Sequence, residues 1–230
     1  MSSLLYTGIV LSLLIFILKI ELGDGHYFIN DPGLVVNKPI KIVGDENEPS
    51  HVILELSGEI VWKSQGGWIE GITIRRPRIA TGATPNNEIL RVESGGRLDM
   101  FNCLLDNRGS IGNCVSCDSG GRWEKISITG ASRNNNGLFL KKNAKVELID
   151  VSILICVSFE VLNFFSCSIL LYEQCTICDN DGVGIAREDG AVAKLSGCTI
   201  ERNGLATNTT KEEEVMMISP AKQPEPIASH

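Results

Sequence analysis

The sequence predicts an all-β protein, a parallel β-helix (solenoid) of about seven coils. Three observations support this fold class. A short pattern recurs six times between residues 67 and 200, apolar residues stand at fixed offsets within each copy, and turn-forming Asn and Gly follow most copies. Periods of 20 to 50 residues are typical of proteins built from stacked structural repeats.

Each copy of the pattern ends in an apolar residue, and successive ends are 23 to 31 residues apart. The residues two and five positions before each end are apolar as well. These offsets fit neither the strict alternation of a straight strand nor the 3.6-residue period of a helix, so a short kinked strand is predicted. The ends, the positions two before them and the positions five before them are, in that order, Ile74, Leu105, Ile128, Ile153, Ile177 and Ile200; Ile72, Cys103, Ile126, Val151, Cys175 and Cys198; and Ile69, Met100, Trp123, Leu148, Tyr172 and Leu195.

A second, weaker apolar pair lies between consecutive kinked strands, so each unit carries at least two strands. A unit of about 24 residues with two or three strands and no helical segment is typical of one coil of a parallel β-helix, with strands stacked about 4.8 Å apart. The apolar pairs are Leu90 and Val92, Val115 and Cys117, Leu138 and Leu140, and Val183 and Ile185.

Upstream of the repeat, residues 34–36, 40–42 and 52–54 are expected to form strands of a less regular first coil. Ile42 is placed in the column of Ile74, with one longer corner between them. A second longer corner is expected at residues 77–87, which hold the extra length of the longest repeat.

The ends of the chain differ in composition from the predicted β-helix domain, which covers residues 21–204. Residues 1–20 form an apolar N-terminal segment, uncharged from residue 4 to residue 18. Its length leaves three interpretations open: a transmembrane helix that anchors the chain, a cleaved signal, or neither, that is, a first strand or a truncated N-terminus. Residues 205–230 lose the repeat and gain Glu, Lys, Pro and Thr, so a disordered tail is predicted.

The composition of the two ends leaves two alternatives for the localisation of the protein. Lys residues after the apolar segment favour a membrane-anchored chain with a cytosolic β-helix domain. Secretion is the second reading, and in that case Asn208, within an Asn-Thr-Thr sequon, is a glycosylation site. The stretch from residue 151 to residue 172 is also apolar, but the repeat runs through it without a slip, so a coil of the solenoid is predicted there.

The eight cysteines are expected to be reduced, and three of them are expected to be core residues. Cys103, Cys175 and Cys198 share one inward column, where they act as small apolar side chains. The two Cys-x-x-Cys pairs are too far apart in the repeat to share a zinc ion, so no metal site is predicted. The net charge of −7 and the lack of a basic stripe argue against a nucleic-acid partner.

The outward column six residues before each end is the place to look for function, and its first members are the candidate binding residues Trp68, Asp99, Arg122 and Glu147. Asp99 and Glu147 would stand two coils apart with Arg122 between them, a separation similar to that of the carboxylates of an inverting glycosidase. We prefer the interpretation that these acidic and basic side chains, on adjacent strands, neutralise one another on the protein surface. Trp68 could instead stack on a sugar or anchor a peptide. No catalytic residue and no cofactor are predicted.

Four runs carry a family resemblance: Gly25-His-Tyr, Lys38-Pro-Ile-Lys-Ile-Val-Gly44, Val52-Ile-Leu-Glu55 and Gly67-Trp-Ile-Glu-Gly-Ile-Thr-Ile-Arg-Arg-Pro77. Together with the Cys-x-Ile strands they resemble the pectin-lyase-like right-handed, single-stranded parallel β-helix. Within that group, residues 21–204 look most like the SHC SH2-domain-binding proteins and the β-helical F-box proteins.

The resemblance implies a fold shared by sugar-cleaving enzymes and protein-binding scaffolds. The polygalacturonase motifs and the pectate lyase Arg-x-Pro-x-x-Arg are absent, and no F-box precedes the coils. A non-catalytic scaffold with a protein partner is therefore the leading hypothesis. Two alternatives stay open: a carbohydrate-binding or carbohydrate-active domain, and a truncated fragment of a larger β-helix. If residues 1–20 anchor the chain, residues 4–20 would contact the membrane.

Overall fold

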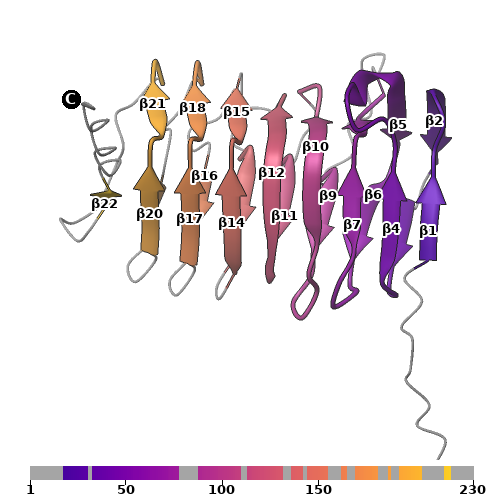
Figure 1. Cartoon of the computed structure of the whole chain (residues 1–230), viewed down its shortest axis with the longest axis horizontal. Helices are drawn as coiled ribbons and strands as arrows, with labels where there is room; N and C mark the ends of the chain where they lie inside the picture. Colours follow the sequence, from indigo (N-terminus) through magenta and orange to yellow (C-terminus); the bar gives the residue numbers. More distant parts are fainter. Residues whose placement is uncertain are drawn as a thin grey trace, which may run out of the picture.

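The computed structural model describes residues 18–30, 33–77, 88–109, 113–131, 136–141, 144–154, 162–164, 169–180, 186–187, 192–203 and 215–218. Strands stack side by side in chain order along the long axis of the molecule (Figure 1). Every strand pairing in this part of the chain is parallel. The predicted fold class is confirmed.

Two sheets form the walls of the solenoid, one of 15 strands and one of 7. In the larger sheet, β10 (Asp99–Asp106) and β12 (Gly120–Thr129) are long, and the other coils have two half-strands each, except the last, where the described residues form β22 alone. The first halves are β1 (Leu18–Glu21), β4 (Ile40–Val43), β7 (Trp68–Glu70), β14 (Lys145–Ile149), β17 (Ile169–Glu173), β20 (Val192–Ser196) and β22 (Val215–Ile218). The second halves are β2 (Gly25–Ile29), β5 (Val52–Leu56), β8 (Thr73–Arg75), β15 (Ser152–Leu154), β18 (Thr176–Cys178) and β21 (Thr199–Glu201).

The 7-stranded sheet forms the opposite wall. Its order is β19 (Ala186–Arg187), β16 (Leu162–Phe164), β13 (Leu138–Leu140), β11 (Val115–Cys117), β9 (Leu90–Val92), β6 (Glu59–Trp62) and β3 (Gly33–Val36). The predicted pairs from Leu90 to Leu140 align in this sheet as expected. Val183 and Ile185 lie outside the described residues.

A column of left-handed residues causes the kink in each long strand. Three positions before each apolar end, φ is positive, between 48° and 65°, at Gly71, Asn102, Lys125, Asp150, Gln174 and Gly197. One left-handed residue turns the chain so that the side chains on both sides of it, five and two positions before the end, face the same way. This is why the repeat has a three-residue spacing that fits neither a flat strand nor a helix.

This column offers a stability test at Gln174, an exposed residue with φ 55°. Asn tolerates the left-handed region better than Gln. Gln174→Asn is therefore expected to raise the free energy of unfolding by about 0.5–1 kcal/mol and the melting temperature by about 2 °C. Gln65→Asn is the matched control, since Gln65 is exposed and its φ is not positive. Equal shifts for both variants, measured by thermal unfolding, would contradict the left-handed assignment.

The predicted inward ladder is confirmed by the pairing register. Met100 pairs with Trp123, Trp123 with Leu148, and Leu105 with Ile128. The register continues through the apolar stretch after Val151, because β17 pairs with β14 and β20 without a slip. The described residues of that stretch therefore belong to the solenoid, as the repeat predicts.

The core fills the space between the two sheets, with Trp62 and Trp123 as its largest side chains. Both indoles are fully buried, and each donates its N–H to a backbone carbonyl, Trp62 to Arg97 and Trp123 to Leu98, at 3.0 Å in both cases. These bonds remove the cost of burying an unpaired indole N–H. Burial of this kind contributes about 1.5–3 kcal/mol per large apolar side chain.

The predicted register of the first coil is wrong in one respect. Ile42 pairs with Ile69, and Leu54 is the residue that pairs with Ile74. The extra chain lies within the kinked strand, between β4 and β5, where residues 44–51 form a loop ending in the 3-10 turn η1 (Pro49–His51). Corner length carries no apolar periodicity, so counting residues between strands could not locate this insertion.

A buried arginine closes the corner that follows β5. Arg76 has no exposed surface, and its guanidinium donates to the carbonyl oxygens of Leu56 (3.3 Å), Ser57 (2.8 Å), Gly58 and Glu88 (2.8 Å). Carbonyl dipoles thus surround the charge. The sequence cluster of Arg75, Arg76 and Arg78 is consequently not a basic patch on one face, since Arg76 points into the core.

Asparagines tie neighbouring corners together. Asn113 accepts bonds from the backbone N–H (2.8 Å) and the side-chain amide (3.2 Å) of Asn136. Asn180, which is buried, donates to Asn203 at 2.8 Å. Stacked amides of this kind satisfy the polar groups of tight corners without water. The Asn-rich turns of the sequence therefore contribute to coil stacking as well as to chain reversal.

Two of the predicted end segments are partly described. Within the predicted disordered tail, Val215–Ile218 forms β22, which pairs with β20 and continues the large sheet. Four apolar residues can extend a parallel ladder although the surrounding composition is polar. The rest of the tail, Asn208 included, residues 1–17 and most of the expected corner at 77–87 lie outside the described residues.

Candidate functional site

The four candidate binding residues come together as one column on the large sheet. Trp68 pairs with Lys41 on one side and Asp99 on the other, and Arg122 pairs with Glu147. The backbone N–H of Arg122 donates to Asp99 Oδ1 at 2.8 Å, which joins the two halves. We call the surface formed by Lys41, Trp68, Asp99, Arg122 and Glu147 the charged strand face. Leu171 and Lys194 continue its backbone column, but their side chains lie outside the described residues.

Arg122 is the centre of this surface. Its guanidinium lies 3.4 Å from both carboxylate oxygens of Glu147 and 3.3 Å from Glu124. Its side chain is 47% exposed, so it remains available to a partner. Asp99 has a second basic neighbour, Arg97, at 3.1 Å. The carboxylates of the face are thus neutralised within the face itself.

Trp68 is half-buried and is held by two neighbours. Its indole N–H donates to Glu70 Oε2 at 2.9 Å, and Lys41 Nζ lies 5.5 Å from the ring centroid. Lys41 also pairs with the same Glu70 oxygen at 2.9 Å. A cation over an indole face and a bonded indole N–H both favour one ring orientation. The ring is therefore fixed before any partner arrives.

The next outward column crosses the same strands. Phe101 lies between Glu70 and Glu124, and Lys125 Nζ is 5.2 Å from the Phe101 ring centroid. This arrangement gives the charged strand face an apolar edge beside its ion pairs. An aromatic edge next to a half-exposed Arg is a common composition for the centre of a protein interface.

The geometry of Asp99 and Glu147 differs from what a pair of glycosidase carboxylates needs. Such a pair must leave the scissile bond and a water molecule free access to both groups. Here the Arg122 side chain reaches from its own strand to Glu147, and its backbone N–H occupies an oxygen of Asp99. A sugar would have to displace the guanidinium before it reached both carboxylates.

A second polar cluster lies at the other end of the same strands, and the sequence did not indicate it. Glu55 is buried, and one of its oxygens accepts from Arg75 Nε at 3.0 Å, with His26 Nε2 at 3.2 Å and Arg108 Nη1 at 3.7 Å. The wrong alignment of Ile42 with Ile74 hid this cluster. Once Leu54 is aligned with Ile74, Glu55 stands directly beside Arg75.

The contacts of this second cluster are of a kind that holds neighbouring coils together. One carboxylate shared by two guanidiniums is neutralised and can hold three chain segments together. His26 also packs against Phe28, with ring centroids 4.3 Å apart. Phe28 is 65% exposed, which makes it the most exposed large apolar side chain of the described residues.

One group among the described residues has a composition that could hold a metal ion. The ligand atoms of Asp24, Asp45 and His51 lie within 4.8 Å of one another. Asp45 already accepts from the backbone N–H groups of Asn47 (2.9 Å) and Glu48 (3.2 Å), and His51 Nδ1 lies 2.8 Å from its other oxygen. These internal bonds explain the arrangement without an ion, and the predicted absence of a metal site stays a prediction.

The same bonds shift the titration of this loop. Backbone N–H groups, with that of Asn47 first, lower the pKa of Asp45 because they stabilise the carboxylate. The hydrogen bond to Asp45 raises the pKa of His51. His51 is exposed and Asp45 is half-buried, and their pairing joins the two ends of the loop between β4 and β5.

Of the three cysteines predicted in the core, Cys103 and Cys175 are buried and Cys198 is not fully buried. Cys103, Cys114, Cys117, Cys175 and Cys178 are buried, whereas Cys198 is half-buried, and all six are free thiols. Burial raises the pKa of Cys103 to about 12. Cys114 and Cys117 lie in the opposite wall from Cys175 and Cys178, so the two Cys-x-x-Cys pairs do not meet. Cys156 and Cys167 lie outside the described residues.

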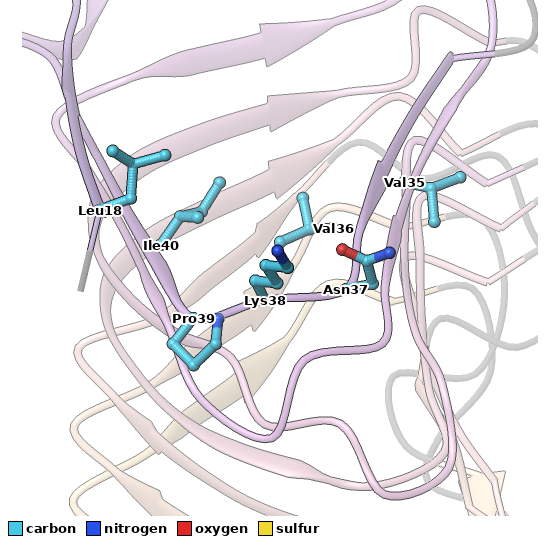
Figure 2. A pocket seen from close by; sticks show the side chains of 7 residues that line it. All are labelled: Leu18, Val35, Val36, Asn37, Lys38, Pro39 and Ile40. Atoms are coloured by element: carbon cyan, nitrogen blue, oxygen red, sulfur yellow. The ribbon is translucent and has the colours of Figure 1, made fainter. Parts of the chain in front are cut away.

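A hollow of about 360 Å³ lies at the N-terminal end of the stack, lined by Leu18, Val35, Val36, Asn37, Lys38, Pro39 and Ile40. Figure 2 shows mainly aliphatic side chains around it, with Lys38 and Asn37 as the polar ones. Leu18 and Val35 are exposed because β1 and β3 each pair on one side only. The lining holds no carboxylate, imidazole or thiol, so its chemistry is that of packing.

The described part of the chain contains no helix that is long and apolar enough to cross a membrane. The segment predicted as an anchor or a signal is described only from Leu18 onward, where the chain forms β1 and pairs with β4.

Parallel strands in chain order, an apolar interior and a strand face of mutually paired charges define a β-solenoid protein. Residues 59–214 match the family model described as the right handed beta helix region, and the chain belongs to that family. No curated protein and no solved structure matches the chain. The family agrees with the predicted pectin-lyase-like type at the level of the fold.

Proposed function

We propose that this chain is a non-catalytic β-helix that binds a protein partner through the charged strand face. The observation that carries the proposal is the fixed pair of Trp68 and Arg122 on a rigid sheet. Trp and Arg dominate the binding energy of protein interfaces. Both side chains here have their orientation set by neighbours and still keep exposed surface.

Preorganisation strengthens this argument. Ordering a flexible side chain costs about 0.5–1.5 kcal/mol on binding. Trp68 is held by Glu70 and Lys41, and Arg122 by Glu124 and Glu147, so that cost is already met within the free protein. A parallel sheet that is anchored coil by coil also keeps the spacing between the two side chains constant.

The charge distribution favours a protein over other partners. Basic and acidic groups alternate along the charged strand face, with Lys41, Arg97 and Arg122 next to Glu70, Asp99 and Glu147. A nucleic acid would need a continuous basic stripe. A partner that carries both signs of charge, arranged in complement, fits this surface.

The sequence likeness to the SHC SH2-domain-binding proteins and the β-helical F-box proteins supports the same reading. The fold that this likeness implies is shared by sugar-cleaving enzymes and protein-binding scaffolds, and this chain carries none of the polygalacturonase or pectate lyase motifs. The Arg122 side chain between Asp99 and Glu147 supports it independently of the likeness.

A charge-swap variant tests the proposal. Arg122→Glu with Glu147→Arg keeps the internal ion pair but reverses the charges that a partner meets, so stability is expected to stay close to that of the wild type. Binding should weaken at least about tenfold. The readout is quantitative affinity capture with mass spectrometry, comparing each recovered protein between wild type and variant, with Trp68→Ala as a second binding variant.

The matched control is the swap Lys63→Glu with Glu93→Lys. Lys63 Nζ and Glu93 Oε2 are 3.4 Å apart, and neither residue belongs to the charged strand face. This control should recover the same partners as the wild type. Equal recovery by the wild type and the Arg122/Glu147 swap would contradict the proposal. Release of unsaturated or reducing ends from polygalacturonate or other acidic glycans would instead favour the carbohydrate-active alternative.

A further inference from the structure

Two thiols lie in consecutive coils of the inward column, Cys175 just before β18 and Cys198 just before β21. The following residues, Thr176 and Thr199, are direct partners in the sheet, and the backbone N–H of Thr199 donates to the carbonyl of Cys175 at 2.8 Å. Neighbouring strands lie about 4.8 Å apart. That spacing falls within the range of about 4.4–6.8 Å between the Cα atoms of a disulfide.

The two cysteines occupy the same position in neighbouring strands, one residue before a paired Thr in each, and their thiols are close enough to shift each other's pKa. Cys175 also lies 3.4 Å from the carbonyl of Glu173, and Cys198 lies 3.5 Å from that of Ser196. Cys103 occupies the same column but has Ile126 as its neighbour in the next coil. Cys103 can therefore serve as a reference thiol that has no cysteine in the next coil, in contrast to Cys175.

Accessibility and acidity separate these thiols further. Cys198 is half-buried, whereas the other described cysteines are buried. Cys175, in the neighbouring coil, is only 1% exposed. The neighbouring Cys175 thiol lowers the pKa of Cys198, while burial raises the pKa of Cys103 to about 12. The thiolate is the reactive form of cysteine, so Cys198 is the described thiol best placed to meet an oxidant.

We propose that Cys175 and Cys198 form a redox-reactive dithiol that a small peroxide converts into a disulfide joining two consecutive coils. The Cys198 thiolate attacks one peroxide oxygen, the O–O bond breaks, and Cys198 becomes a sulfenic acid while hydroxide leaves. The Cys175 sulfur then attacks the sulfenic sulfur, the S–O bond breaks, and a second hydroxide leaves. With the two thiol protons the products are one disulfide and two waters, and a dithiol reductant reverses the reaction.

The disulfide would close the segment from Cys175 to Cys198, one whole coil of the solenoid. Closing a loop restricts the unfolded chain, so oxidation is expected to stabilise the C-terminal coils. This inference is independent of the charged strand face, because both sulfurs lie in the inward column.

The experiment uses the full reduced chain treated with hydrogen peroxide. Intact mass spectrometry should show the loss of two hydrogen atoms, and peptide mapping should find the Cys175–Cys198 cross-link, which dithiothreitol removes. Before oxidation, Cys198 should react with an alkylating reagent at least about tenfold faster than Cys103.

Cys198→Ser should abolish the cross-link, and Cys103→Ser, the matched control, should leave it intact. Cys175→Ala is the second test variant: in it, Cys198 should stop at the sulfenic acid or a higher oxide. A cross-link between other cysteines, an unpaired oxide at Cys198 in the wild type, or alkylation of Cys198 no faster than that of Cys103 would each overturn the proposal.

Discussion

Replacing Ile128 by Asp is expected to unfold the central coils of the solenoid. Ile128 has no exposed surface and stacks between Leu105 and Ile153 in the inward ladder. A carboxylate at this place would lose its hydration without gaining a charged partner, and the apolar contacts of two coils would be lost with it. The expected loss exceeds about 4 kcal/mol, a large share of the 5–15 kcal/mol of a typical domain.

The control for this prediction is Ser127→Asp, one residue earlier. Ser127 is half-buried on the outward side of the same strand, so its variant should stay within about 1 kcal/mol of the wild type. Chemical denaturation followed by far-ultraviolet circular dichroism measures both. If Ile128→Asp fails to accumulate, Ile128→Ala, with an expected loss of about 2–5 kcal/mol, keeps the comparison possible. Similar losses at residues 127 and 128 would contradict the assigned register.

Replacing Arg76 by Met is expected to destabilise the protein by about 3–5 kcal/mol. The variant keeps much of the side-chain volume but removes every donor that Arg76 directs at the corner carbonyls of Leu56, Ser57 and Gly58 and at Glu88. A buried carbonyl that loses its donor costs about 1–3 kcal/mol. Arg76→Lys should fall between the wild type and Met, because one ammonium cannot reach all of these oxygens.

Arg97→Met is the matched control, because the Arg97 side chain is 57% exposed and pairs with Asp99 on the surface. Surface pairs of this kind contribute about 0–1 kcal/mol. Thermal unfolding should therefore place Arg76→Met at least about 6 °C below Arg97→Met. Coinciding melting curves would show that the corner does not depend on the buried guanidinium.

These two predictions differ in how far the sequence alone could lead to them. Ile128 was assigned to the core from the repeat, because its neighbours in the ladder recur at nearly constant spacing. Arg76 was not, since arginine is almost never fully buried. Its burial depends on carbonyl groups that come together only when the corner after β5 is folded against the chain that precedes β9.

The same division applies to the candidate site. The column of Trp68, Asp99, Arg122 and Glu147 could be predicted because each residue stands at the same offset in its repeat, and the pairing register confirms that they share one face. The contacts that give the column its character, such as Glu70 beneath Trp68 and Glu124 beside Arg122, required the coordinates. The Glu55 cluster was missed because the first coil was aligned on the wrong residue.

By itself, the sequence determined the parallel β-helix, its inward ladder, the core position of Cys103 and Cys175, and the place in the solenoid of the described residues of the 151–172 stretch. A repeat of 23 to 25 residues encodes all of these, since the same local spacing recurs in coil after coil. Only the tertiary structure decided the register of the first coil, the burial of Arg76 and the partial exposure of Cys198. Corners vary in length without an apolar pattern, and side-chain bonds between coils exist only once the coils are stacked.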